Sequence, residues 1–117
     1  MEFSNYSFGQ ITIDGIMYNE DVVLNKGHIE LRDKTASEPF KAEYGHTPLT
    51  LAENIPWECQ SLIIGIGDSG ALPITEEIHK KAGELGVKIL AIRTPDAIKI
   101  LNSANLEDTN AIIHLTC

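Results

Sequence analysis

The amino-acid sequence predicts an α/β fold, in which a mixed β-sheet joins an N-terminal antiparallel meander to a C-terminal βαβαβ portion. Three observations predict this fold. The chain has 117 residues, which suits one domain and leaves no room for two. Its first third consists of short β-forming runs divided by glycine-containing turns, and its last half alternates apolar runs with helical patterns. We therefore treat residues 1–117 as a single domain.

Short strands separated by tight turns are expected in the first third. Residues 10–13 and 16–19 flank the Asp14-Gly15 pair, and a two-residue Asp-Gly loop favours a type I′ hairpin because glycine accepts a positive φ. Residues 21–24 are a third strand and residues 28–32 a fourth. The fourth alternates strictly between apolar and polar residues, so one of its faces is expected to meet solvent.

The middle of the chain, residues 33–60, has little regular pattern. Thr50 followed by Glu53 forms a capping box, which predicts one short helical turn that ends before Pro56. Long irregular stretches often carry function, so Tyr44 and His46 are a candidate loop site. His46 could act as a general base near neutral pH, and the alternative is an exposed turn residue.

The last half begins with a strand and a helix. Residues 61–66 are almost continuously apolar, as expected for a strand covered on both faces. Residues 75–85 carry apolar side chains at helical spacing, and Gly86 is placed to end that helix.

A second strand–helix–strand unit completes the chain. Residues 87–92 are a strand, and Thr94 followed by Pro95 predicts a helix with Thr94 as its N-cap. This helix is expected to stop near Asn105, and residues 111–116 form the last strand. Strands joined by helical crossovers run parallel, so this half predicts a parallel segment of sheet.

Charge excludes two classes of partner. The chain has 9 basic and 17 acidic residues and a net charge of -8. Proteins that bind phosphate backbones or anionic lipid place many Lys and Arg against them, so we expect neither nucleic acid nor a membrane as a partner.

Cysteine usage and the N-terminus bear on location. Cys59 and Cys117 are more typical of reduced thiols than of a disulfide, because no secretory leader is apparent. No apolar run is long enough to span a bilayer. The expected location is the cytoplasm.

The Gly65–Gly70 segment matches the dinucleotide-binding pattern G-x-G-x-x-G directly after a strand. Four residues intervene before the next helix, the acid expected about twenty residues later is missing, and Asp68 would repel phosphate. The alternative, a structural turn from strand to helix, is favoured, and no cofactor is expected. The same segment resembles the nucleophile motif of chymotrypsin-like proteases, but the chain is too short for their two-barrel fold.

The ends of the two parallel strands give the best candidate ligand site. Gly67, Asp68 and Ser69 should lie beside Arg93 and Thr94, because α/β sheets bind ligands outside the carboxyl ends of their strands. Arg93 offers two parallel donors and Thr94 opens a helix, which suits a small anion or carboxylate. The alternative is that Arg93 pairs with Asp68 and Thr94 only caps the helix.

The four histidines do not predict a metal site. His28, His46, His79 and His114 are widely spaced and form no recognisable ligand pair. His114 is more typical of a buried, hydrogen-bonded structural residue than of a ligand or base. No catalytic residue is assigned.

Six segments taken together resemble the Mth-type domain family. They are residues 8–15, 21–24, 44–46, 62–67, 94–97 and 112–117, in the same order and over essentially the whole chain. The resemblance is strongest to archaeal members. It implies a three-layer compact α/β domain. Relatives include a mitochondrial assembly factor for respiratory complex I and a mammalian protein associated with adipogenesis.

Two functions follow as hypotheses. The first, implied by the resemblance, is a non-catalytic interaction or assembly module that binds a protein partner or forms a homo-oligomer. It predicts an exposed apolar patch around residues 36–58. The second is a small-anion or carboxylate-binding protein, or an enzyme, with its site at residues 67–69 and 93–94. It predicts a concave pocket with converging polar groups.

Overall fold

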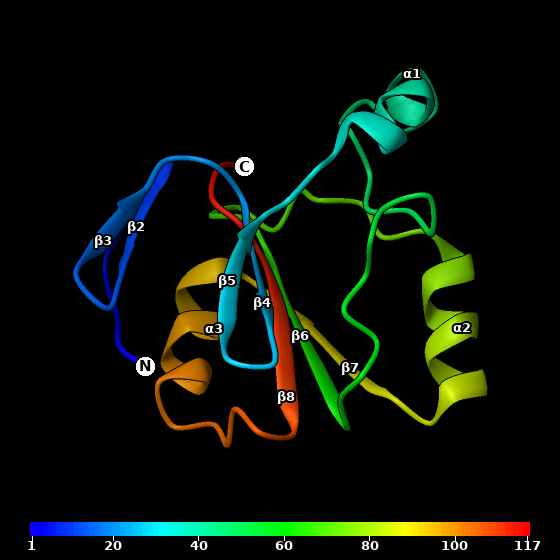
Figure 1. Ribbon diagram of the computed structural model, residues 1–117. Coiled ribbons are helices and arrows are strands. Elements are labelled where there is room, and N and C mark those ends of the chain that lie inside the picture. The colour runs from blue at the N-terminus through cyan, green and yellow to red at the C-terminus, as the bar shows by residue number, and fades with distance from the viewer.

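Two β-sheets and a set of short helices make up the computed structural model, which describes residues 1–117 (Figure 1). The smaller sheet is antiparallel and contains β1 (Phe3–Ser7), β2 (Gln10–Ile13) and β3 (Ile16–Tyr18). The larger sheet has the order β5-β4-β8-β6-β7 and contains β4 (Val22–Asn25), β5 (His28–Leu31), β6 (Ser61–Ile66), β7 (Lys88–Ile92) and β8 (Thr109–His114). The helices are η1 (Thr35–Phe40), α1 (Lys41–Tyr44), α2 (Glu76–Leu85) and α3 (Thr94–Leu101).

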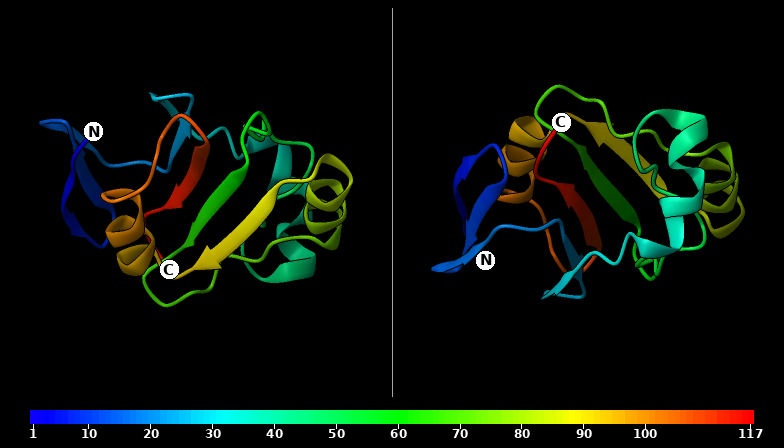
Figure 2. Two further views of the ribbon diagram at one scale, coloured as in Figure 1. Left: turned by 90° about the horizontal axis from the view of Figure 1, so that it is seen from below. Right: turned by 90° about the horizontal axis from the view of Figure 1, so that it is seen from above.

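The five-stranded sheet is mixed, as the sequence predicts. β6 runs parallel to both β7 and β8, while β4 runs antiparallel to β5 and β8. The sheet separates two helices, with α3 and the small sheet on one side and α2 on the other (Figures 1 and 2). The α/β fold class is therefore confirmed.

The core forms on both faces of the large sheet because side chains alternate along each strand. On β6, Ile63 packs toward α3 and the small sheet, whereas Leu62 and Ile64 pack toward α2. The same alternation holds on β8, where Ile113 joins the first cluster and Ile112 the second. The nearly continuous apolar run of β6 is thus explained by burial on both faces.

The antiparallel portion is divided between the two sheets, which the sequence did not indicate. The Asp14-Gly15 hairpin forms as predicted, and both residues have a positive φ. β3 and β4 do not pair, however, and β1 was not predicted. β1 is held by Asn102, which lies just beyond α3. The Asn102 side chain accepts a hydrogen bond from Phe3 N at 2.8 Å and donates one to Phe3 O at 2.9 Å.

Two predicted helix boundaries were wrong. α3 begins at Thr94 itself, with Arg93 in the capping position, and it ends at Leu101 rather than near Asn105. The Thr50–Glu53 capping box forms no helix. The Thr50 hydroxyl instead accepts a hydrogen bond from Ala52 N at 3.2 Å, within a turn. Gly86 ends α2 in the left-handed conformation, as predicted. No helix in the fold has the length and apolar character needed to cross a lipid bilayer.

Candidate functional site

The structure brings the predicted strand-end residues together, but several of their polar groups bond to each other. The Thr94 hydroxyl accepts a hydrogen bond from Gly67 N at 2.9 Å and donates one to His114 O at 2.6 Å. Thr94 N donates to Gly67 O at 3.1 Å, and Thr94 is fully buried. This residue therefore fastens the ends of β6, β8 and α3 to one another and does not act as a helix cap.

The other members of this group are also bonded within the protein. Arg93 Nε donates to the backbone oxygen of Asp68 at 2.7 Å, and the Ser69 hydroxyl donates to Cys117 O at 2.9 Å. Gly67 has a φ of 103°, and a Cβ there would lie 2.1 Å from the carbonyl carbon of Cys117. This edge of the sheet is filled by the last residues of the chain, so ligand binding by Arg93 and Ser69 stays a prediction.

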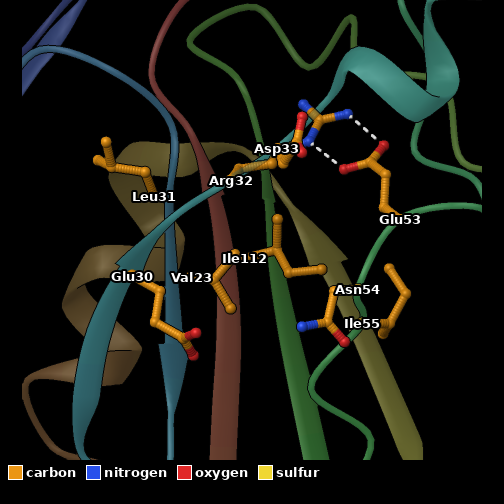
Figure 3. Close-up of a pocket in the computed structure, with 9 residues that line it drawn as sticks. All are labelled: Val23, Glu30, Leu31, Arg32, Asp33, Glu53, Asn54, Ile55 and Ile112. Atoms are coloured by element: carbon orange, nitrogen blue, oxygen red, sulfur yellow. Dashed lines mark hydrogen bonds and ion pairs between the residues drawn. The ribbon is translucent and has the colours of Figure 1, made fainter.

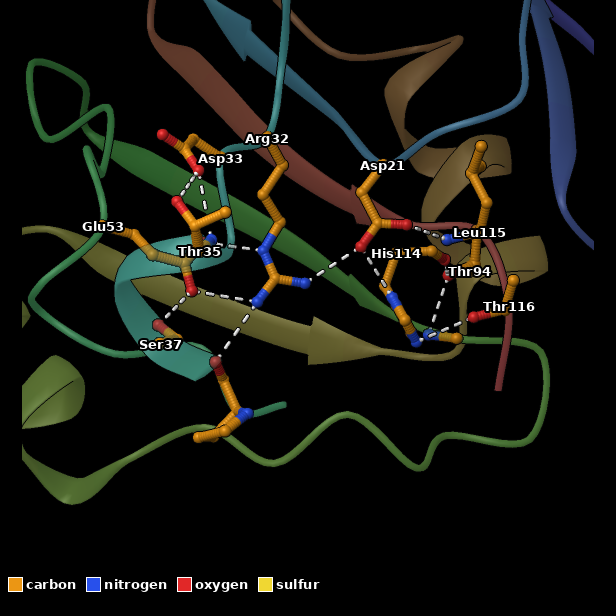
Figure 4. Close-up of polar contacts among 12 residues, drawn as sticks. Asp21, Arg32, Asp33, Thr35, Ser37, Glu53, Thr94, His114, Leu115 and Thr116 are labelled. Carbon is orange, nitrogen blue, oxygen red and sulfur yellow. Dashed lines mark hydrogen bonds and ion pairs between the residues drawn. The ribbon is translucent and has the colours of Figure 1, made fainter. Parts of the chain in front are cut away.

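A buried polar network lies across the C-terminal segment from this edge (Figure 4). At its centre is Arg32, whose side chain is only 2% exposed. Its Nε and Nη2 donate to the two carboxylate oxygens of Glu53 at 2.7 and 2.9 Å, and Nη1 donates to Asp21 at 2.9 Å. Burial would lower the pKa of the Arg32 guanidinium, but the two carboxylates outweigh this effect and raise it.

Asp21 links Arg32 to His114. One carboxylate oxygen of Asp21 contacts His114 Nδ1 at 2.7 Å, and the other accepts a hydrogen bond from Leu115 N at 2.9 Å. Burial acts to raise the pKa of Asp21, but the hydrogen bonds from His114 and Leu115 and the charge of Arg32 together lower it below its usual value. Asp21 is therefore ionised in the folded protein and fixes the orientation of the imidazole ring.

Glu53 ties the irregular middle segment to this network. The fully buried Ser37 hydroxyl donates to Glu53 at 2.6 Å and lies 2.7 Å from the Thr50 hydroxyl. Within residues 33–60, which showed little regular pattern in the sequence, polar side chains thus join Ser37 of η1 to the turn that carries Thr50 and Glu53. Sequence reasoning placed Arg32 beside a solvated strand face and Glu53 in a helix cap, and it missed their pairing.

His114 faces a hollow of about 170 Å³. Its Nδ1 is engaged by Asp21, whereas Nε2 has only the Thr116 hydroxyl nearby, at 3.4 Å. The hollow is lined by Arg32, Lys34, Lys41, His46, Thr47, Ala71, Leu72, His114, Thr116 and Cys117. No aspartate or glutamate is among these residues, although the chain as a whole is strongly acidic. We call this space the basic hollow.

A second hollow, of about 210 Å³, lies on the other side of Arg32 (Figure 3). Its lining includes the carboxylates of Glu30, Asp33 and Glu53, and the Arg32–Glu53 pair forms one end of it. The buried network therefore separates a space lined by bases from one lined by acids. No group of three or more His, Cys, Asp or Glu side chains is arranged to hold a metal ion.

The predicted loop site is divided by the structure. His46 lines the basic hollow, whereas Tyr44 lines a third hollow with Phe40 and Leu51. Three exposed apolar side chains therefore lie within residues 36–58, where the sequence predicted an apolar patch. His46 and His114 are 68 positions apart in the chain, so no local motif could have indicated that both line one hollow.

Comparisons with known proteins show the fold. No family model matches the sequence, and no curated protein matches it. The conserved hypothetical protein PH1505 from Pyrococcus horikoshii matches over 100% of both chains with a TM-score of 0.79 and 28% identity. A protein named MT938 matches 99% of this chain over 98% of its own, with a TM-score of 0.64 and 26% identity.

More distant structures share the same architecture. An outer membrane protein from Bartonella henselae matches 98% of this chain over 94% of its own, with a TM-score of 0.65 at 14% identity, which shows the fold alone. The full-length likeness to PH1505 and MT938 shows that this chain shares the fold of these two proteins. Membership in the Mth-type family remains a proposal.

Proposed function

We propose that this protein binds a small anion, a carboxylate or phosphate group, in the basic hollow. The observation that carries the proposal is that His114, held at Nδ1 by buried Asp21, lines a space that contains several bases and no acidic side chain. This proposal keeps the ligand class predicted from sequence. It places the ligand across the C-terminal segment from Arg93.

The residues that line the basic hollow have different roles in binding an anion. Lys34 and Lys41 provide positive charge, and His46 adds to it when protonated. His114 provides a directional contact, because a ring whose Nδ1–H is held by Asp21 can donate from Nε2 when it is protonated. Arg32 is neutralised by Glu53 and Asp21, so its role is to hold Asp21 in position.

An anion titration tests the proposal. A ligand at about a hundred times its dissociation constant stabilises a protein by ~2.7 kcal/mol, which should raise the midpoint of a domain this size by about 10 °C. Phosphate and acetate are added separately, with sodium chloride at equal ionic strength as the control. The imidazole NMR signals of His114 should move, while those of the exposed His28 and His79 should not.

Matched variants separate the two candidate anion sites. Lys41→Gln should weaken binding about tenfold, as expected for loss of one charge-assisted contact. Arg93→Ala should leave binding unchanged. If Arg93→Ala abolishes binding and Lys41→Gln does not, the anion lies at the strand ends and the proposal for the basic hollow is wrong. No stabilisation by either anion also contradicts it.

A second function is favoured by the apolar patch at Phe40, Tyr44 and Leu51. These side chains are 42%, 38% and 43% exposed and surround one hollow. Solvent-exposed apolar side chains gathered in one place are typical of a protein contact. We propose on this basis that the protein also serves as an interaction module, the role that the Mth-type resemblance implies.

Site-specific crosslinking tests the interaction role. A photoreactive residue at position 51 should crosslink to a partner in cells, or to a second copy of the chain. The same residue in place of Leu85, which is exposed to a similar extent, should not. Equal crosslinking at the two positions, or none at position 51, would rule out this face as the contact.

A further inference from the structure

The hollow at Tyr44 has a lining unlike that of the basic hollow. It measures about 280 Å³ and lies between the segment formed by η1 and α1, the turn after Thr50, and the start of α2. Phe40, Tyr44 and Leu51 supply apolar surface, and Glu43 and Glu77 are the only charged residues in the lining. Any occupant therefore meets aromatic rings and carboxylates together.

The walls of this hollow are fixed to each other by the backbone. Leu49 and Ile74 form an isolated parallel β-bridge, in which Leu49 N donates to Pro73 O at 2.8 Å and Thr75 N donates to Leu49 O at 3.2 Å. Leu49 is fully buried. The turn that carries Leu51 is thus attached to the start of α2, so the hollow exists before any ligand binds.

Thr75 leaves an unmet hydrogen bond at this place. The residue lines the hollow and is 7% exposed, and its hydroxyl is the one buried side-chain polar atom in the molecule without a partner. The hydroxyl does not cap α2, although its position suits a cap. Buried polar groups without partners are rare and costly, and a donor from a bound group would satisfy this one after a rotation about the Cα–Cβ bond.

We infer that this hollow is the docking point for an arginine side chain presented by a protein partner. The inference rests on the interaction role proposed above and names the chemistry of the partner. A guanidinium group stacks on aromatic rings and bonds to carboxylates through several donors at once, which matches the lining. The net charge of -8 attracts a basic partner from a distance.

The exposure of the apolar rim selects a protein over a free cation. Binding sites for small molecules bury most of the ligand surface, whereas Phe40, Tyr44 and Leu51 all remain more than a third exposed. A protein segment covers this rim while it inserts one side chain, the usual arrangement of a central contact surrounded by a ring that excludes water.

Peptide titrations followed by amide NMR shifts test the inference. The probe is the blocked tripeptide acetyl-leucyl-arginyl-leucinamide, and its control replaces arginine with citrulline, which has nearly the same shape without the charge. The arginine peptide should bind about tenfold more tightly and move the signals of residues 40–52 and 75–77. Glu77→Gln should reduce its affinity to that of the citrulline peptide, whereas Glu107→Gln, at an exposed acid elsewhere, should not.

Three results would overturn the inference: equal affinity of the two peptides, shifts that map outside the hollow, or ethylguanidinium alone binding as tightly as the peptide. The last would assign the hollow to a free cation. Crosslinking at position 51 together with equal affinity for the two peptides would support the interaction role and contradict only the inference that an arginine docks in this hollow. Thr75→Val should keep the fold and lower the affinity for the arginine peptide. This variant separates the contribution of the hydroxyl from that of charge.

Discussion

Two polar clusters lie on opposite sides of the C-terminal segment, and they differ in what the sequence revealed of them. The strand-end cluster, residues 67–69 with 93–94, follows a glycine-rich motif and was predicted as a site. The buried network of Asp21, Arg32, Glu53 and His114 carries no motif. In the first, the side chains of Thr94 and Arg93 form hydrogen bonds to backbone groups and join the strand ends to each other. In the second, His114 lines a hollow, and its Nε2 has only the Thr116 hydroxyl nearby.

The difference shows that a glycine-rich motif can mark a place where two parts of the chain pack closely. Gly67 is required because Cys117 lies against it, and the turn it allows resembles a phosphate-binding loop only in sequence. The network is assembled from four segments of the chain, and each contributes one charged or titratable side chain.

The largest expected effect comes from breaking the network at its centre. Arg32→Met should lower the free energy of unfolding by about 3–5 kcal/mol, because Glu53 and Asp21 would remain buried without their partner. Arg93→Met, at an exposed residue, should cost less than about 1 kcal/mol. Urea denaturation of both variants measures this contrast. Similar losses of stability in the two variants would show that the buried network contributes no more to stability than an exposed arginine does.

The next largest effect tests close packing at the strand ends. Gly67→Ala should cost about 3 kcal/mol, because the methyl group collides with the backbone of Cys117 and the φ of 103° is unfavourable. Gly70→Ala is the matched control. Its φ is also positive, but the nearest atom lies 3.6 Å away, so the cost should be about 1 kcal/mol. Thermal unfolding measures the loss of stability in both variants. Equal losses would mean that the backbone at Cys117 shifts to accommodate the added methyl group at little cost.

A smaller effect is expected in the pH dependence of stability. The pKa of Asp21 is lowered in the folded protein from an ordinary value of 3.8, so its ionised form stabilises the fold above that pH. This stabilisation should be lost as the pH falls from about 4 through the folded pKa. The difference in stability between wild type and Asp21→Asn should therefore shrink in acid. Denaturant midpoints at several pH values measure this difference.

The matched control for the pH experiment is Glu107→Gln, at an exposed acid outside the network. Its difference from wild type should stay the same between pH 6 and pH 3. A gap between wild type and Asp21→Asn that does not narrow in acid would show that Asp21 contributes through packing rather than through its charge.

Regular elements were predictable from local pattern. The apolar run of β6, the helical spacing of α2 with its stop at Gly86, and the Asp14-Gly15 hairpin each depend on a few adjacent residues, and all three form as expected. β1 escaped prediction because Asn102, almost a hundred positions away, supplies two of its hydrogen bonds.

The candidate site was harder to predict for a related reason. Arg32 ends an alternating run that predicted a solvated face, and only the positions of Glu53 and Asp21 explain why it is buried. One signal was available, because Asp21 stands directly before the apolar Val22 and Val23 and an acid there needs a partner. The sequence did not indicate which of the two arginines that partner is.

The order of strands also bears on how the protein is made. β8 is the last of the eight strands in the chain, yet it lies between β4 and β6, and Val22 pairs with Ile113 across almost the full sequence. During synthesis, the β4–β5 hairpin and the β6–β7 unit emerge first, each with an unpaired inner edge. Such edges invite pairing with other chains. The emergence of β8 is therefore the step that joins the two halves of the large sheet and covers both unpaired edges.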